Sequence, residues 1–172
     1  MGESGFVEFA QSRLNGLRRA AYLLCGDWDR GDDLVQKTLT DVYAQWGRAS
    51  RADNIDAYVR TVLVHRFIDD RRRGWSRVRL VDPVADTSLR ELPAPADDAA
   101  GRLDVRAALA RLAPRQRAAL VLRFLYDMSV EDTAEALNCS TGTVKSQTSD
   151  GLAMMRRLLS DPADLPTTGR TR

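Results

Sequence analysis

The sequence predicts an all-α protein with two small helical domains joined by a flexible acidic linker. Three observations predict this fold: apolar residues recur at steps of three and four, charges fall into blocks, and prolines gather in one acidic stretch. The 172 residues, with 26 Lys and Arg against 24 Asp and Glu, suffice for one medium domain or two small ones. Apolar runs such as 118–122 are far shorter than the roughly 18 residues of a membrane span. We therefore expect no membrane association, no secretory signal and a cytoplasmic protein.

The first module is predicted to begin with two helices. Apolar residues from Phe6 to Leu24 predict the first helix, which ends near Gly26. Asp32 and Asp33 are expected to open the second, because carboxylates suit the positive end of the helix dipole. Its predicted buried stripe is Leu34, Val35, Leu39, Val42, Tyr43 and Trp46. A solvated surface is the plainest interpretation of the polar side of this helix.

A third helix, from about Asp56 to Arg73, is predicted to have one basic and one buried face. The stretch from Arg60 to Arg79 contains seven Arg and two Asp. Asp69 and Asp70 point about 100° apart on a helix, which favours ion pairing over acid–base chemistry. The basic arc consists of Thr61, His65, Arg66, Asp69, Arg72 and Arg73. The lone histidine in this arc is expected to make a hydrogen bond or a DNA contact, because no nucleophile accompanies it.

Residues 81–100 are predicted to form a linker. They contain five acids, one Arg and three Pro, a composition that does not support a packed helix or strand. The modules on either side are therefore expected to be two separate bodies. The tail from Asp161 is expected to fray.

The C-terminal module carries the strongest local pattern, which is typical of a helix-turn-helix. Pro114 suits the first turn of a helix that continues to Tyr126. Ser129 is expected to cap the next helix, Asn138 to adopt the left-handed turn and Ser140 to cap the last helix. The predicted inward stripe of the last helix is Val144, Thr148, Leu152, Met155 and Leu159. Its opposite side presents Thr143, Lys145, Ser146, Gln147, Ser149, Asp150, Arg156 and Arg157. These groups can contact bases and phosphates, although a packed helical hairpin without DNA is the alternative.

The sequence contains few residues that could bind a metal or act as catalysts. Cys25 and Cys139 lie far apart and His65 is the single histidine, so we expect no metal, no cofactor and no disulfide. No nucleophile with a base is present, and we expect no catalytic residues.

Three ordered blocks of sequence resemble the extracytoplasmic-function sigma factors of bacterial RNA polymerase, and among them the actinobacterial SigE-like branch. The blocks are Gly31–Gln36 with its continuation to Trp46, Ala57–Arg72, and Leu112–Arg117 together with Gly142–Ser146. The resemblance covers residues 5 to 160. Lys37, His65, Gln147 and Asp150 depart from the residues that are frequent in the family.

The resemblance implies sigma region 2 at 5–74, an acidic linker at 75–101, sigma region 4 at 102–160 and a disordered tail at 161–172. Binding to the β′ clamp helices of core RNA polymerase is implied for Asp32, Asp33, Gln36, Lys37, Thr40, Asp41 and Gln45. Recognition and melting of the −10 element are implied for Asn54, Tyr58, Arg60, His65, Arg66, Arg72 and Arg73. Recognition of the −35 element is implied for Thr141, Thr143, Lys145, Ser146, Gln147, Ser149, Asp150, Arg156 and Arg157. The β flap, promoter DNA and an anti-sigma factor are the other implied partners.

Two other function classes fit parts of the sequence. A freestanding helix-turn-helix regulator would act as a symmetric dimer on palindromic sites. A small hydrolase or nuclease would need a metal-ligand cluster or an activated nucleophile, which the sequence lacks.

Overall fold

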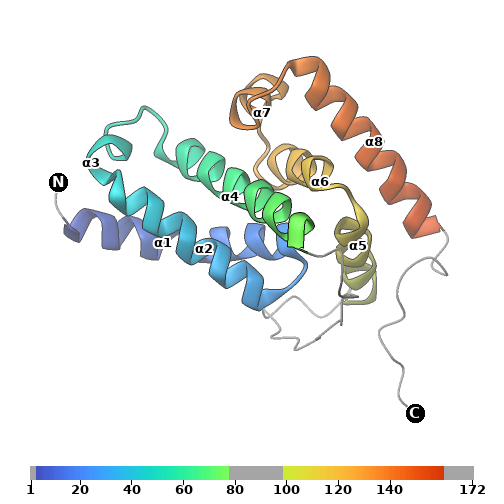
Figure 1. The fold of residues 1–172 in the computed structure, drawn as a ribbon, viewed down its shortest axis with the longest axis horizontal. Helices are drawn as coiled ribbons and strands as arrows, with labels where there is room; N and C mark the ends of the chain where they lie inside the picture. The colour runs from blue at the N-terminus through green and yellow to red at the C-terminus, as the bar shows by residue number, and fades with distance from the viewer. Residues whose placement is uncertain (1–2, 78–98, 161–172) are drawn as a thin grey trace, which may run out of the picture.

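The computed structural model describes residues 3–77 and 99–160, and within these ranges the chain forms helices and no strand. The predicted all-α class is confirmed. The elements are α1 (Glu3–Cys25), α2 (Trp28–Ala44), α3 (Trp46–Ala49), α4 (Ile55–Arg77), α5 (Ala99–Arg111), α6 (Pro114–Leu120), the π-helix η2 (Val121–Leu125), α7 (Val130–Ala136) and α8 (Thr141–Ser160). Figure 1 shows α1, α2 and α4 side by side, with α8 along an outer edge of the molecule.

A tight turn joins α1 to α2. Gly26 has a φ of +76°, a backbone conformation that glycine adopts without the strain a Cβ would bring. Asp27 then caps α2, because its side chain accepts a 2.8 Å hydrogen bond from the Arg30 amide. The expectation that Asp32 and Asp33 open this helix is therefore wrong, since the helix begins one turn earlier.

The buried stripe of α2 agrees with the predicted one at Leu34, Val35 and Val42, but it also contains Thr38, and Leu39 is only partly buried. Trp46 is buried and its ring packs against Phe6 and Phe9, with ring centroids 5.3 and 5.5 Å away. Tyr43, by contrast, is 48% exposed although Phe6 contacts one side of its ring. The prediction that Tyr43 is buried is wrong, because α1 does not extend over the outer side of its ring.

The predicted helix from Arg115 to Tyr126 is divided into two kinds of helix. Pro114 begins α6 as expected, but the chain then changes to the single π turn η2. The Tyr126 amide donates to the Val121 carbonyl at 3.3 Å, the five-residue spacing of a π-helix. This turn leaves Phe124 62% exposed.

The local signals of the helix-turn-helix are confirmed. Ser129 Oγ accepts from the Asp132 amide at 2.9 Å, and Ser140 Oγ accepts from the Thr143 amide at 3.1 Å. Asn138 has a φ of +49°. Gly151 permits close packing on α6, because a Cβ there would lie 3.2 Å from a methyl carbon of Leu120.

The inward stripe of α8 ends on a different residue from the predicted one. Leu158 is buried, whereas Leu159 is 39% exposed. The prediction of a buried Leu159 is wrong because α5, which packs on this end of α8, covers the adjacent position.

The two modules are present, but they are not the separate bodies expected from the linker. One apolar cluster contains Leu24, Leu63 and Phe67 from the first module together with Leu122 and Leu137 from the second. Packing the apolar faces of the two modules against each other removes both from water, which stabilises their contact. This stabilisation does not depend on the composition of the segment between the modules. Residues 78–98, most of the predicted linker, and the tail at 161–172 lie outside the described residues.

Candidate nucleic-acid interface

The outward side of α8 is the first candidate interface. Its start is held by the Ser140 cap and by α7, so that Lys145, Ser146, Ser149 and Asp150 are exposed. Figure 1 shows this helix on the periphery, with its first turn beside α7. A helix placed in this way after a short preceding helix has the arrangement of a DNA-recognition helix.

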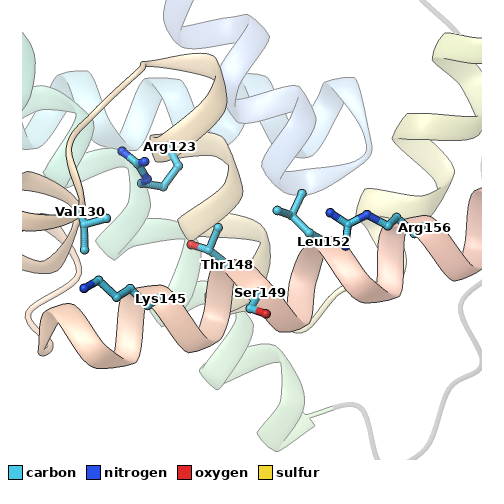
Figure 2. A pocket seen from close by; sticks show the side chains of 7 residues that line it. All are labelled: Arg123, Val130, Lys145, Thr148, Ser149, Leu152 and Arg156. Carbon is cyan, nitrogen blue, oxygen red and sulfur yellow. The ribbon is translucent and has the colours of Figure 1, made fainter.

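A groove of about 320 Å³ runs along one edge of α8. Its lining consists of Arg123, Val130, Lys145, Thr148, Ser149, Leu152 and Arg156. Figure 2 shows Arg123 and Lys145 toward one end of the groove and Arg156 toward the other. Three of the lining residues are cationic and none is acidic, so the groove favours an anion.

Most of the other predicted −35 residues lie on a different edge of the same helix. Asp150 accepts a 3.4 Å hydrogen bond from Ser146, and Arg157 contacts the Met154 sulfur at 2.9 Å. Gln147 is half-buried, and so is Thr143, whose hydroxyl lies 2.9 Å from Ser140 Oγ. Thr141 is exposed at the start of α8. The structure therefore divides the predicted set between two edges.

Three of the predicted −10 residues on α4, namely Tyr58, Arg60 and Arg66, contact other elements of the protein. The Arg66 guanidinium forms a bidentate ion pair with Asp41 of α2. Tyr58 donates to Gln45 at 3.3 Å, and the Asn54 side chain caps α4 by accepting from the Ala57 amide at 2.9 Å.

Two predicted −10 residues of α4 are exposed, and one contacts the other module. His65 and Arg72 are exposed. Arg60 places its guanidinium 4.4 Å from the centre of the Tyr126 ring, which belongs to the second module. The side chain of Arg73 lies outside the described residues.

The polar side of α2 is partly covered by ion pairs. Asp32 pairs with Arg18 at 2.7 Å, and Lys37 lies between Asp33 at 2.7 Å and Asp70 at 3.2 Å. These pairs hold the pKa of both basic side chains above their usual values. Gln36 and Thr40 are exposed between them. Some of the predicted polymerase-binding residues therefore also form the ion pairs that connect α2 to α1 and α4.

A buried arginine joins the modules. Arg117 of α6 donates to the carbonyls of Leu24, at 2.6 Å, and Leu112, at 3.2 Å, and also to that of Ala110. These carbonyls lie at the ends of α1 and α5, where the helix dipole favours a cation. Burial nevertheless lowers the pKa of Arg117 to about 10.

Two other groups near this contact between modules have shifted pKa values. Burial raises the pKa of the Cys25 thiol to about 11, and that of Tyr126 to about 12. No hydrogen-bond partner for the Tyr126 hydroxyl exists among the described residues. Both groups therefore remain neutral at physiological pH.

Sequence reasoning missed three residues at these surfaces. Arg123 and Thr148 line the groove, and Phe124 is the most exposed large apolar side chain in the described ranges. The run of five Arg without an acid from Val105 to Tyr126 pointed toward the first of these. Within the same ranges, no group of three or more His, Cys, Asp and Glu could hold a metal ion. None of the described helices is long and apolar enough to span a bilayer.

Family models and individual relatives both match this chain to sigma factors. Residues 9–77 match the family model of sigma-70 region 2, and residues 102–155 match that of sigma-70 region 4. The chain is 37% identical over 158 residues to an RNA polymerase sigma-E factor of Streptomyces coelicolor, covering 90% of this chain and 85% of the relative. It is 33% identical over 143 residues to the ECF RNA polymerase sigma factor EcfG of Rhodopseudomonas palustris, covering 83% and 78%.

A solved structure has a similar fold over most of the chain. The sigma factor RpoE of Bartonella quintana, in complex with the anti-sigma factor NepR, matches with a TM-score of 0.69 and 27% identity. The match covers 89% of this chain and 97% of that one.

Proposed function

The chain belongs to the extracytoplasmic-function group of RNA polymerase sigma factors, and from this membership we propose a separate binding role for each of three helices. It directs promoter-specific transcription as a non-enzymatic subunit, while the polymerase performs phosphoryl transfer in the cytoplasm. The polar side of α2 binds core polymerase. The α4 helix with the loop before it binds and melts the −10 element, and α8 binds the −35 element.

The observation that supports this proposal is the outward side of α8, where Lys145, Ser149 and Arg156 surround a groove without any acid. Phosphates and base edges need such unpaired donors. The predicted boundaries are region 2 at 5–74, a linker at 75–101, region 4 at 102–160 and a tail at 161–172. The linker is shorter than predicted at both ends, because α4 continues to Arg77 and α5 begins at Ala99. Two modules on one polymerase contact DNA at high effective concentration, so weak individual contacts suffice.

The contact between the modules bears on how α4 reaches DNA. Arg60 cannot contact a DNA backbone on the ring side that Tyr126 occupies at 4.4 Å. We propose that this contact opens when the two modules bind promoter elements on the polymerase. An anti-sigma factor is a further partner in this proposal, consistent with the NepR complex of the Bartonella quintana relative.

Transcription from linear promoter templates tests the proposed function. Core polymerase with this chain is expected to start at a defined promoter position, whereas core polymerase alone gives unspecific initiation. Replacement of Lys145 by Ala reduces specific initiation, while replacement of the exposed Arg115 on α6 by Ala leaves it unchanged. Equal unspecific output with and without the chain contradicts the proposal.

The alternative of a freestanding dimeric regulator is not favoured by the matches to sigma-70 regions 2 and 4. Copurification decides between the two functions. A sigma factor recovers the β and β′ subunits, whereas a dimeric regulator shifts palindromic DNA unaided.

A further inference from the structure

The edge of α2 that faces α4 carries a row of polar side chains. Lys37, Asp41 and Gln45 follow one another at steps of one helical turn, and Gln45 is the C-cap of the helix. Their partners on α4 are Asp70 for Lys37, Arg66 for Asp41 and Tyr58 for Gln45. We call these three pairs the α2–α4 ladder. Because the partner numbers fall as those on α2 rise, the ladder runs along two antiparallel helices, which lie side by side in Figure 1.

The outer strip of α2, which consists of Asp33, Gln36 and Thr40, faces another direction. At 100° per residue, Asp33 and Thr40 lie within about 20° of each other around the helix, and Gln36 lies within about 60° of both. Asp41 lies about 100° from Thr40 and about 140° from Gln36. All three residues of the outer strip are exposed. A partner protein can therefore approach the outer strip without touching the contacts between Asp41 and α4.

We propose that Asp41 and Gln45 are positioning residues of the −10 site, which hold Arg66 and Tyr58 of α4 in place for DNA. Core polymerase contacts the outer strip, and the ladder is not part of that interface. The proposal rests on the proposed functions of α2 and α4. It divides the residues that the resemblance assigns together to polymerase binding into a polymerase-binding strip and a DNA-positioning ladder.

The geometry of the Arg66–Asp41 pair leaves donors for DNA. Arg66 donates through Nε and Nη2, and each hydrogen bond goes to a different oxygen of Asp41. A guanidinium has five N–H groups, so the pair leaves three of them, including both on Nη1, for another acceptor. A bidentate pair also fixes the plane of the guanidinium. An arginine that Asp41 has already ordered loses less conformational freedom when it binds a phosphate or a base.

The contact between Tyr58 and Gln45 acts in the same way. The Tyr58 hydroxyl donates to Gln45 Oε1 at 3.3 Å, and the ring is half-buried. Because its one proton is given to Gln45, the hydroxyl meets DNA as an acceptor, which suits the amino group of an adenine. An aromatic ring held at a fixed angle also offers a face on which an unstacked base can stack.

Lys37 departs from the residues that are frequent in the family, and the ladder gives it a role. Its ammonium lies 2.7 Å from Asp33 and 3.2 Å from Asp70. Asp70 belongs to α4, where an unpaired carboxylate would repel the phosphates of a DNA strand. Lys37 compensates this charge, so the face of α4 beside Arg66 stays favourable for DNA.

Two affinities separate positioning from polymerase binding. The full chain is titrated with core polymerase, and the assembled holoenzyme is titrated with a single-stranded oligonucleotide that carries the −10 sequence. D41N should weaken oligonucleotide binding about five- to tenfold, the cost of ordering one long side chain, and should keep the wild-type affinity for core polymerase. Q36A, on the outer strip, should weaken core binding about tenfold. At saturating core polymerase, the Q36A holoenzyme should bind the oligonucleotide as wild type does.

A double-mutant cycle shows whether Asp41 acts through Arg66. R66Q should weaken oligonucleotide binding, and D41N should have no further effect in the R66Q background. D41E keeps a carboxylate and should restore most of the binding that D41N loses. A merely structural role would instead weaken binding in both backgrounds, and it would also weaken binding to a duplex that carries only the −35 element.

Two further variants complete the test. E135Q removes an exposed carboxylate of α7 outside the ladder and should keep both affinities at the wild-type level. Q45A removes the acceptor of Tyr58 at an exposed position, so the test continues if thermal unfolding shows that D41N does not fold. Q45A should weaken oligonucleotide binding in the wild-type background and have no further effect in the Y58F background.

Four results overturn the proposal. In the first, D41N weakens core binding and leaves oligonucleotide binding intact, because Asp41 is then a polymerase contact. In the second, D41N binds the oligonucleotide more tightly, because the carboxylate then masks Arg66. The third is additivity of D41N and R66Q, and the fourth is a wild-type value of both affinities in D41N and Q45A. Failure of the proposed function looks different, because the wild-type holoenzyme would then not prefer the −10 oligonucleotide to a scrambled one.

Discussion

The helices α4 and α8 both carry basic residues on one face, but these residues have different surroundings in the folded protein. On α4, Arg66 pairs with Asp41 and Arg60 stacks on Tyr126, so these two cations are engaged by the protein itself. On α8, Lys145 and Arg156 extend into an open groove and have no ion-pair partner within the described ranges. A basic face in sequence therefore indicates a capacity to bind DNA, whereas the tertiary contacts decide whether its cations are available.

The different surroundings of these cations predict different effects of mutation on stability and on binding. Removing an engaged cation or its partner should change the stability of the fold, because the remaining group loses a partner. Removing an unpaired surface cation should leave stability unchanged and weaken only the binding of an external anion.

The largest effect is expected at Arg117, the most deeply engaged cation. Replacing it by Met leaves the Leu24, Ala110 and Leu112 carbonyls without their donor and should lower the free energy of unfolding by about 3 kcal/mol. Urea denaturation measures this loss. The exposed Arg115 on the same helix is the matched control, and its Met variant should stay within about 0.5 kcal/mol of wild type. Equal stabilities of the two variants would show that the contact between the modules does not depend on Arg117.

A pH effect of nearly this size is expected at Cys25, near Arg117. Because folding raises its pKa from 9 to about 11, the neutral thiol stabilises the fold fully below pH 9. That contribution is lost as the pH rises through 11, and it amounts to about 2 to 3 kcal/mol. Urea denaturation between pH 8 and pH 11 should therefore show a steeper fall for wild type than for Cys25→Val. Parallel pH curves would mean that the thiol is solvated in the folded protein.

On α8, the expected effects concern DNA binding and not stability. Lys145→Ala should weaken promoter binding about five- to tenfold on all −35 sequences, because one phosphate contact is lost. Gln147→Ala should instead change the preference at one base pair by about tenfold, the value of a bidentate base contact. Competition binding with mutated −35 duplexes separates the two effects. Wild-type selection and salt dependence in both variants would mean that α8 is not the recognition helix.

The smallest effect is expected at Asp41, whose carboxylate engages Arg66. Asp41→Asn should lower stability by about 0.5 kcal/mol, since the ion pair is partly exposed. Asp150→Asn provides the comparison on α8, where the carboxylate pairs with no cation in the described ranges and stability should not fall. Chemical denaturation of both variants measures the difference, and a larger loss at Asp150 would break the contrast between the helices.

Local signals were predicted correctly wherever a few neighbouring residues decide the backbone. Ser129 and Ser140 cap the helices expected for them, and Asn138 takes the left-handed conformation. The cap of α2 was misplaced because Asp27, Asp32 and Asp33 all suit a helix start. Asp27 alone follows the turn at Gly26 and accepts the Arg30 amide.

The candidate site was predicted in part. The polar side of α8 is exposed as expected, but sequence spacing did not separate its two edges or include Arg123. That residue reaches the groove because η2 adds a π turn, and no local pattern signals this change of helix type. The roles of the predicted polymerase, −10 and −35 residues stay predictions that the experiments above address.

The sequence by itself determined which segments are helical, where most of them begin and end, and to which family the chain belongs. Periodicity and capping are local properties, and family motifs consist of residues in order along the chain. Only the tertiary structure decided that the two modules share one apolar core and that Arg117 joins them. It also decided that Arg60 and Arg66 of α4 contact other side chains, whereas Lys145 and Arg156 of α8 line an open groove. Those outcomes depend on which apolar and charged surfaces meet in space, and neither the spacing along a helix nor the composition of a linker contains that information.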